Sequence, residues 1–188
     1  LGGEHHIVEL DVFAVEFREL GGPKLLARGH PFVGDVAAVV ERDGRFLVVE
    51  EVTSDGLRLN NPAGHLDPGE TPQRAVERET LEETGRRFFP EHLIGVYLTR
   101  SQRPERCEDV TYLRFAYAGS VSEPLPGHSL DSGIVRTLWL TLDELRACPE
   151  RHRSPLLLRC IEDHVAGHRL PLDLVHADES LFTGVLKP

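Results

Sequence analysis

The sequence predicts an α+β sandwich, in which helices cover a mixed sheet. Segments typical of strands and segments typical of helices alternate along the chain without a repeating βαβ unit. Neighbouring strand segments are joined by links of hairpin length. The chain has 188 residues, of which 40% are hydrophobic and 28% charged, and this composition suits one domain with a core of ordinary size.

The predicted strands are short apolar segments bounded by turn residues. Asp43-Gly44 marks a hairpin turn between two segments rich in apolar and β-branched residues. A loop is expected at Pro62-Ala63-Gly64, because proline and glycine interrupt regular structure. Strands are expected at residues 33–40, 46–52, 94–99, 110–117 and 135–140, with a short segment at 57–60.

Three helices are predicted. Thr71 is a typical N-cap, Pro72 suits the first helical position, and Gly85 suits the residue after the last turn. These signals predict a helix of about thirteen residues between Thr71 and Gly85. Two further helices are expected at residues 142–147 and 155–168.

Residues 1–30 differ in pattern from the rest of the chain and are interpreted as an N-terminal extension to a domain of residues 31–188. Residues 7–20 are apolar with interspersed acids, which is typical of a strand, and Gly21-Gly22-Pro23 then breaks the pattern. The extension is open to three interpretations: an extra edge strand, a dimerisation arm or a leader introduced by cloning.

The formal net charge of −10 restricts the partners of the protein. Such a surface repels phosphate backbones and anionic lipids, which argues against a nucleic-acid or membrane partner. A small anionic substrate remains compatible, because a bound divalent cation reverses the local field. Three widely spaced cysteines and the lack of an apolar run of about 18 residues predict free thiols and a cytoplasmic location.

The acids of the helix expected after Thr71 carry the functional signal. Glu79, Glu82 and Glu83 stand at i, i+3 and i+4, so their carboxylates lie on one face. Like charges this close destabilise a helix unless a cation compensates them, and clustered carboxylates suit Mg²⁺ or, alternatively, Mn²⁺. The alternative interpretation is a solvated acidic face that nearby arginines balance.

The residues around these acids resemble the Nudix box. The chain matches all seven polar and glycine positions of the box: Gly64, then five residues, Glu70, seven residues, Arg78-Glu79, two residues, Glu82-Glu83, one residue and Gly85. Chance would produce such a match on the order of once in a million chains. The resemblance implies the Nudix α/β/α sandwich, with a loop–helix–loop catalytic motif against a mixed sheet.

Two residues depart from the box. Thr80 and Arg86 stand where the family usually has aliphatic side chains. We expect Thr80 to turn its methyl inward and to bond its hydroxyl back to the helix. We expect Arg86 to lay its stem on apolar surface, with Phe88 supplying the bulk.

The resemblance implies a role for each box residue. Glu82 and Glu83 would bind the metal, together with the carbonyl of Gly64, and Glu79 would be a further ligand or the general base. Arg78 and Glu70 would pair to hold the helix and the loop in register. Outside the box, Asp131 is the leading candidate for another metal ligand or the base, and the alternatives are Glu105, Glu108 and Asp109.

A closer resemblance connects the chain to the NudJ phosphatase branch of that family, through residues 46–51, 61–66, 112–115, 153–156 and 170–173. It implies removal of terminal phosphate from nucleoside tri- and diphosphates and from hydroxymethylpyrimidine diphosphate, a thiamine precursor. Candidate phosphate-binding residues are His65, Arg58, Arg100 and Arg114. The rivals are a sanitising enzyme that releases pyrophosphate and a non-catalytic ligand sensor. The family resemblance also makes a homodimer an expected assembly.

Overall fold

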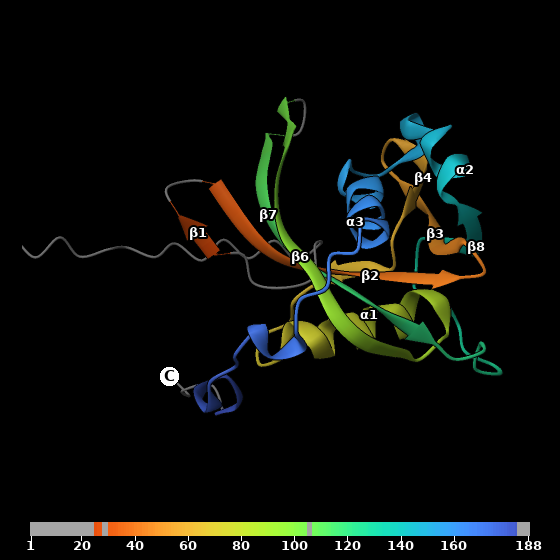
Figure 1. Ribbon diagram of the computed structural model, residues 1–188. Coiled ribbons are helices and arrows are strands. Elements are labelled where there is room, and N and C mark those ends of the chain that lie inside the picture. Colours follow the sequence, from red (N-terminus) through yellow and green to blue (C-terminus); the bar gives the residue numbers. More distant parts are fainter. Residues whose placement is uncertain (1–24, 28–29, 105–106, 184–188) are drawn as a thin grey trace, which may run out of the picture.

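A mixed sheet forms the centre of the molecule in the computed structural model, which describes residues 25–27, 30–104 and 107–183 (Figure 1). Its strands are β1 (Leu25–Ala27), β2 (His30–Arg42), β3 (Arg45–Thr53), β4 (Gly56–Asn60), β5 (Ala63–His65), β6 (Phe88–Arg103), β7 (Glu108–Val121) and β8 (Ile134–Thr141). The helices are α1 (Pro72–Thr84), α2 (Leu142–Arg146) and α3 (Leu156–Val165), with the 3-10 helices η2 (Pro149–Arg151), η3 (Leu172–Leu174) and η4 (Glu179–Phe182). The strand expected at residues 7–20 lies outside the described residues.

Strand β2 connects the two halves of the sheet. It runs parallel to β7 from Phe32↔Thr111 to Val40↔Gly119 and antiparallel to β5 along its other edge. Strand β6 then pairs with β7 in a long antiparallel hairpin. At its far end β2 turns through Asp43-Gly44 into β3, which pairs with β4 and β8. The Nudix box segment therefore begins at β5, on the edge of the central strand.

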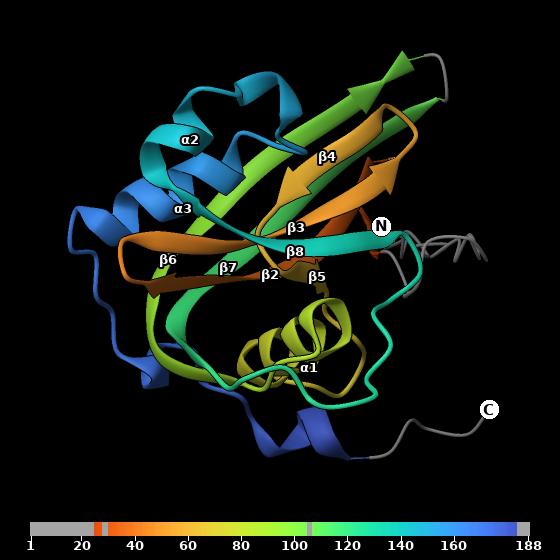
Figure 2. The same cartoon turned by 90° about the vertical axis from the view of Figure 1, so that its right-hand side faces the viewer.

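Helices cover both faces of the sheet, with α1 on one side and α2 and α3 on the other (Figures 1 and 2). The residues of β2 alternate between the two layers, as the pleat of a strand requires. The core under α1 contains Val36, Ala38, Val40, Leu47, Ala75, Val76, Phe88, Leu93, Tyr117 and Val121. The core under α2 and α3 contains Val39, Phe46, Val48, Leu59, Ile94, Ala116, Ala118, Leu145, Leu156, Leu157, Cys160 and Ile161. These layers confirm the predicted α/β/α sandwich.

Helix α1 begins and ends where the sequence predicts. The Thr71 hydroxyl accepts a hydrogen bond from the Arg74 amide at 3.2 Å, which caps the first turn. Gly85 adopts the left-handed conformation (φ 65°) that ends the helix, and its amide donates to the Leu81 carbonyl at 2.8 Å. The motif is therefore held at both ends by local contacts.

The two departures from the box are accommodated in different ways, and Nη1 of Arg86 donates a hydrogen bond to the Ser122 carbonyl at 3.0 Å. The Thr80 hydroxyl donates to the Val76 carbonyl one turn earlier at 2.7 Å, so no buried polar atom is left unpaired there. Arg86 is buried and its guanidinium lies 6.0 Å from the centre of the Trp139 ring. Phe88 fills the neighbouring core under α1.

Several predicted boundaries differ from the structure. A loop was expected at residues 62–64, but Ala63 and Gly64, with His65 after them, pair with β2. Strand β6 extends well beyond the predicted residues 94–99, because its register shifts at two bulges let it continue past Pro90 and Gly95. Helix α3 spans 156–165 and not 155–168.

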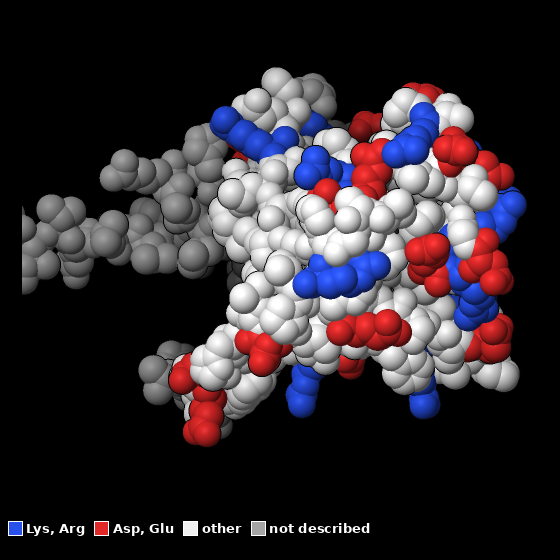
Figure 3. Space-filling model, in the orientation of Figure 1, with Lys and Arg blue, Asp and Glu red and all other residues white. Residues whose placement is uncertain are grey.

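The surface carries charges of both signs. On the face shown in Figure 3, acidic and basic side chains are interspersed and many of them are neighbours. The cysteines Cys107, Cys148 and Cys160 are free thiols, as predicted. No helix in the described part of the chain is both long and apolar enough to cross a membrane.

Candidate active site

Arg78 occupies the centre of the box residues. Its guanidinium donates to Glu70 at 2.6 Å and 3.2 Å, which joins α1 to the preceding loop as expected. It also donates to Glu79 at 2.7 Å, to Glu82 at 3.1 Å and to the His65 carbonyl at 3.0 Å. Burial raises the pKa of Glu70, but the hydrogen bonds from Arg78 and from the Asp67 amide outweigh it, so the pKa lies below its usual value. Glu70 is thus a stable anion that orients Arg78.

Gly64 and Glu79 lie against each other. A Cβ atom on Gly64 would overlap the Glu79 carboxylate, so only glycine lets the side chain approach β5 this closely. Burial raises the pKa of Glu79 to about 7, against the opposing effect of the Arg78 hydrogen bond. The charges of Glu82 and Asp131 raise it further. Glu79 therefore has the proton affinity that a general base needs near neutral pH.

Glu83 is the most deeply buried acid of the helix. Its carboxylate accepts a hydrogen bond from the Ala63 amide at 2.9 Å, which ties α1 to β5. Burial raises its pKa well above the usual value, and the charges of Glu51 and Glu79 add to this shift. Glu83 therefore lies in a partly desolvated region near Glu51 and Glu79, whose charges make its ionisation less favourable.

The loop between β7 and β8 brings Asp131 to the end of α1. The Asp131 amide donates to the Glu82 carbonyl at 3.0 Å, and the Leu125 amide donates to the Gly85 carbonyl at 2.8 Å. Asp131 thereby lies near enough to influence the charge of Glu79. The alternatives are differently placed: Glu108 pairs with Arg103, Asp109 pairs with Arg100, and Glu105 lies outside the described residues.

The donor chemistry of this region fits a hard divalent cation. Burial makes the ionised form of Glu79 and Glu83 unfavourable and raises their pKa values, and a bound cation would stabilise that form. Oxygen donors of this kind are the ligands that Mg²⁺ prefers. Within the described residues, no three His, Cys, Asp or Glu side chains already converge as a metal-binding group. Arg78 holds Glu79 and Glu82 instead, so ion binding is expected to compete with the Arg78 contact to Glu82.

The four predicted phosphate-binding residues lie in different surroundings. His65 follows Gly64 in β5, and its ring stacks on Tyr112 with the ring centres 6.2 Å apart. Arg58 lies on β4 and donates to the carbonyl of its neighbour Leu57. Arg100 is exposed near the end of β6 and forms a bidentate ion pair with Asp109.

Arg114, the fourth candidate, is buried between the strands. Its guanidinium pairs with Asp35 at 2.6 Å, and both side chains are almost completely enclosed. Burial raises the pKa of Asp35, while Arg114 opposes that shift. Because β2 and β7 place Asp35 and Arg114 at the same register position, the pair also joins the two parallel strands. The surroundings of Arg114 are those of a core ion pair.

Two residues near the box acids were given no role from the sequence. Glu51 of β3 is buried, pairs with Arg153 and influences the charge of Glu83. The available signal was local: Glu50 and Glu51 are consecutive acids that follow four consecutive apolar residues of one strand. Arg153 lies about a hundred positions further along the chain, so its proximity depends on the fold alone.

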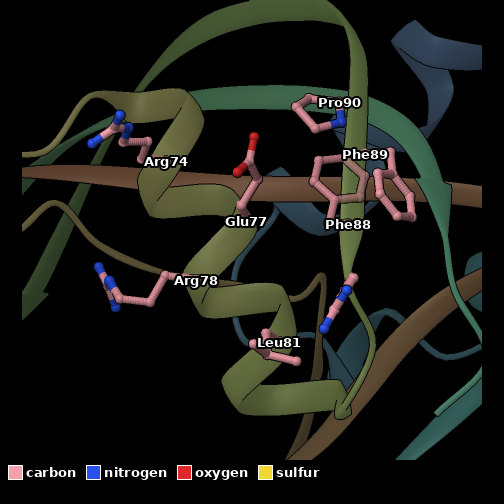
Figure 4. A pocket seen from close by; sticks show the side chains of 8 residues that line it. Arg74, Glu77, Arg78, Leu81, Phe88, Phe89 and Pro90 are labelled. Carbon is pink, nitrogen blue, oxygen red and sulfur yellow. The ribbon is translucent and has the colours of Figure 1, made fainter. Parts of the chain in front are cut away.

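A hollow on the outer side of α1 lies apart from most of the carboxylates. It encloses about 430 Å³ between the helix and the start of β6. Its lining residues are Arg74, Glu77, Arg78, Leu81, Arg87, Phe88, Phe89 and Pro90 (Figure 4). Arg78 is the member that also contacts the box acids, so the hollow is a neighbour of the candidate active site and not its centre.

The chain is similar to characterised families and structures. The family model described as NUDIX domain matches residues 31–160. Phosphatase NudJ of Escherichia coli strain K12 is 35% identical over 140 residues, which cover 74% of this chain and 88% of the relative. A Nudix hydrolase structure from Nitrosomonas europaea is 45% identical, with a TM-score of 0.71, over 78% of this chain and 97% of that one. A MutT Nudix hydrolase from Burkholderia pseudomallei, 22% identical with a TM-score of 0.56 over 70% and 97% of the two chains, shares the fold.

The fold and the box define a hydrolase built on an α/β/α sandwich with a loop–helix–loop carboxylate motif. The chain belongs to the Nudix family and is a Nudix hydrolase, homologous to phosphatase NudJ. Nudix hydrolases act on small phosphorylated substrates and generally use divalent metals such as Mg²⁺.

Proposed function

We propose that this enzyme hydrolyses a phosphoanhydride bond in nucleoside tri- and diphosphates or in hydroxymethylpyrimidine diphosphate, and that it releases orthophosphate. The main support for this proposal is the sequence similarity to phosphatase NudJ over 140 residues. It is supported by the presence of all box carboxylates, which argues for catalysis and against a ligand sensor. The net charge of −10 agrees with a small substrate whose phosphates are neutralised locally.

Mg²⁺ is the proposed cofactor, with Mn²⁺ as the alternative. Glu82, Glu83 and the carbonyl of Gly64 would hold it, with Asp131 as a further ligand, and Glu79 would be either another ligand or the general base. When bound, the ion neutralises phosphate charge and lowers the pKa of a water molecule. The chain itself contributes position and charge, which are what phosphoryl transfer chiefly requires.

Glu79 is the residue best suited to accept the proton of the attacking water. Its pKa of about 7 means that the carboxylate is ionised in a large fraction of molecules and can still take up a proton. The close contact with Gly64 fixes its carboxylate, and Arg78 fixes it from the other side. Arg78 in turn is oriented by Glu70, so these four residues are proposed to act as one positioning unit.

A second candidate function is pyrophosphate release from nucleoside triphosphates, as in a sanitising enzyme. The carboxylate arrangement supports it equally, because both reactions hydrolyse a phosphoanhydride bond of the triphosphate. They differ in which bond is broken: the bond between the β- and γ-phosphates for orthophosphate, and the bond between the α- and β-phosphates for pyrophosphate. The sequence similarity to NudJ favours orthophosphate.

The proposal is tested with a substrate panel in the presence of Mg²⁺. The panel contains nucleoside tri- and diphosphates, ADP-ribose and hydroxymethylpyrimidine diphosphate, with orthophosphate and pyrophosphate measured separately. Glu82→Gln is the matched control, because it removes a box charge with little change in size and lies at a half-exposed position.

Orthophosphate release that is lost in the variant supports the proposal. Pyrophosphate as the main product favours the sanitising function. Absence of metal-dependent turnover with every member of the panel would refute both.

A further inference from the structure

Two neighbouring ion pairs connect the segment before α3 to strand β3. Arg151 pairs with Glu50 at 2.6 Å, and Arg153 pairs with the next residue, Glu51. The carboxylates are similarly buried, with 4% and 9% of the Glu50 and Glu51 side chains exposed. The arginines are similarly half-exposed, at 42% and 49%. The two pairs therefore form a natural comparison within one protein.

The two carboxylates differ in how completely they are satisfied. Glu50 is paired through both oxygens, because Arg151 donates to one and Arg136 donates to the other at 2.7 Å. Glu51 accepts from Arg153 through Oε2, and the Asn60 side chain also acts on it as a hydrogen-bond donor. Within the described residues Arg153 is the cation paired with Glu51. The Glu50 carboxylate therefore shares two arginines, whereas the Glu51 carboxylate depends on one.

The two pairs also differ in their electrostatic surroundings. The cations acting on Glu50 are Arg136 and Arg151. Arg153 acts not only on Glu51 but also on Glu83 of the box and on Asp35. Its charge also reaches Tyr112, on which the His65 ring stacks. Arg153 thus contacts Glu51 directly and lies close enough to Glu83 for its charge to act on that box acid.

Arg153 is held in place from two directions. Its backbone amide donates to the Leu59 carbonyl of β4 at 2.9 Å, and Nη1 of its guanidinium donates to Glu51. A guanidinium has five N–H donors in a fixed plane, and nearly half of this side chain is accessible. A planar cation that is fixed at one edge and open to solvent beside acidic catalytic residues is suited to bind a phosphate group.

We propose that Arg153 is a substrate-binding residue that contacts a phosphate of the substrate, while Glu51 holds its guanidinium in position. This assignment rests on the proposed function only in requiring a diphosphate-containing substrate, and it does not depend on which product is released. Arg151 and Glu50 form the structural counterpart. Their removal perturbs the same segment without removing a phosphate contact.

The test measures binding of methylenediphosphonate, a non-hydrolysable diphosphate, by calorimetry in the presence of Mg²⁺. Arg153→Ala weakens binding by about 10- to 100-fold, as expected for the loss of a charge-assisted contact, and raises KM for the substrate by a similar factor. Arg153→Lys gives an intermediate loss, because it keeps the charge and loses the planar donor pair. Arg151→Ala binds within about twofold of the wild type.

Thermal unfolding of the three variants separates stability from binding. Arg153→Ala leaves the buried Glu51 carboxylate without its paired cation, whereas Glu50 keeps Arg136 after Arg151→Ala, so the larger loss of stability is expected for Arg153→Ala. If Arg153→Ala fails to fold, Arg153→Lys decides the question, since it retains a cation beside Glu51.

Binding by the Arg153 variants as tight as that of Arg151→Ala would overturn the inference, as would failure of the wild type to bind the probe. If the Arg153 variants bind the probe weakly and the wild-type enzyme releases pyrophosphate, the proposed product is corrected while the proposed role of Arg153 stands.

Discussion

The buried pair of Asp35 and Arg114 provides a quantitative test of the interpretation that Arg114 is a core residue. Arg114→Ala leaves the Asp35 carboxylate enclosed without its cation. Breaking a buried ion pair in this way typically costs about 3–5 kcal/mol of unfolding free energy. For a domain of this size each kcal/mol corresponds to about 2–4 °C, so the melting temperature is expected to fall by about 6–20 °C.

Arg100→Ala is the matched control, because it removes an exposed bidentate arginine–aspartate pair between β7 and its other neighbour, β6. Its melting temperature should stay within about 2 °C of the wild type. A further variant, Asp35→Leu combined with Arg114→Met, removes both charges and should recover most of the lost stability. Scanning calorimetry at pH 8 measures all three.

The loss caused by Arg114→Ala should also depend on pH. Burial raises the pKa of Asp35 and Arg114 opposes the shift, so the variant has a still higher folded-state pKa. A raised folded-state pKa favours the folded protein at low pH, where Asp35 is neutral, and this advantage is lost as pH rises through that pKa. The difference in melting temperature between the variant and the wild type should therefore shrink as the pH is lowered from 8. Equal melting temperatures for the Arg114→Ala and Arg100→Ala variants at pH 8 would refute the reasoning.

The box residues provide three further tests. Gly64→Ala should lower kcat by about 100-fold while the protein remains folded, since the new Cβ displaces the Glu79 carboxylate and a displacement of about 1 Å costs that much in rate. Steady-state kinetics would measure kcat and circular dichroism would check the fold, and an unchanged kcat would contradict the prediction. Without a divalent ion, the free energy of unfolding should fall by about 1–2 kcal/mol as pH rises from 4.5 through about 7, because the raised pKa of Glu79 favours the folded state only while this group is protonated. Melting curves of the wild type should show this fall with pH, Glu79→Gln should remove most of it, and Mg²⁺ should offset it most at high pH. Arg78→Lys should lower kcat by about 10- to 100-fold, because one ammonium cannot reproduce the guanidinium contacts to Glu70, Glu79 and Glu82. A kcat equal to that of the wild type would show that Arg78 does not belong to the proposed positioning unit.

Local signals predicted the central helix accurately. The cap at Thr71, the proline at position 72 and the glycine at position 85 act through contacts between residues close in sequence, and the helix spans 72–84. Thr80 was equally predictable, because its hydroxyl bonds within the helix. These residues carry their structural information in their own neighbourhood, so the sequence alone was sufficient.

Pairing between distant segments was the part that the sequence could not supply. Pro62-Ala63-Gly64 has the composition of a loop, and residues 63–65 form a strand only because β2 offers an edge. The extent of β6 depends in the same way on β7, which carries it past Pro90 and Gly95. The pairing of Arg114 with Asp35 could not be predicted from the sequence either, because it arises from the parallel register of β2 and β7.

The candidate site shows the same division. The acids of α1 are recognisable from spacing, whereas Glu51 and Arg153 meet only because β3 and the segment before α3 come together. The contribution of Asp131 depends on a loop that returns to the end of α1. Contacts of this kind need the fold before they can be assigned.

The most direct test of the proposed reaction is the product formed from one nucleoside triphosphate in H₂¹⁸O with Mg²⁺. We expect that orthophosphate is released, that it carries the ¹⁸O label, and that chelation of the metal or the Glu82→Gln substitution abolishes its formation. Pyrophosphate as the main product would contradict the proposed reaction, and labelled orthophosphate formed equally well by Glu82→Gln would contradict the assignment of the active site to α1.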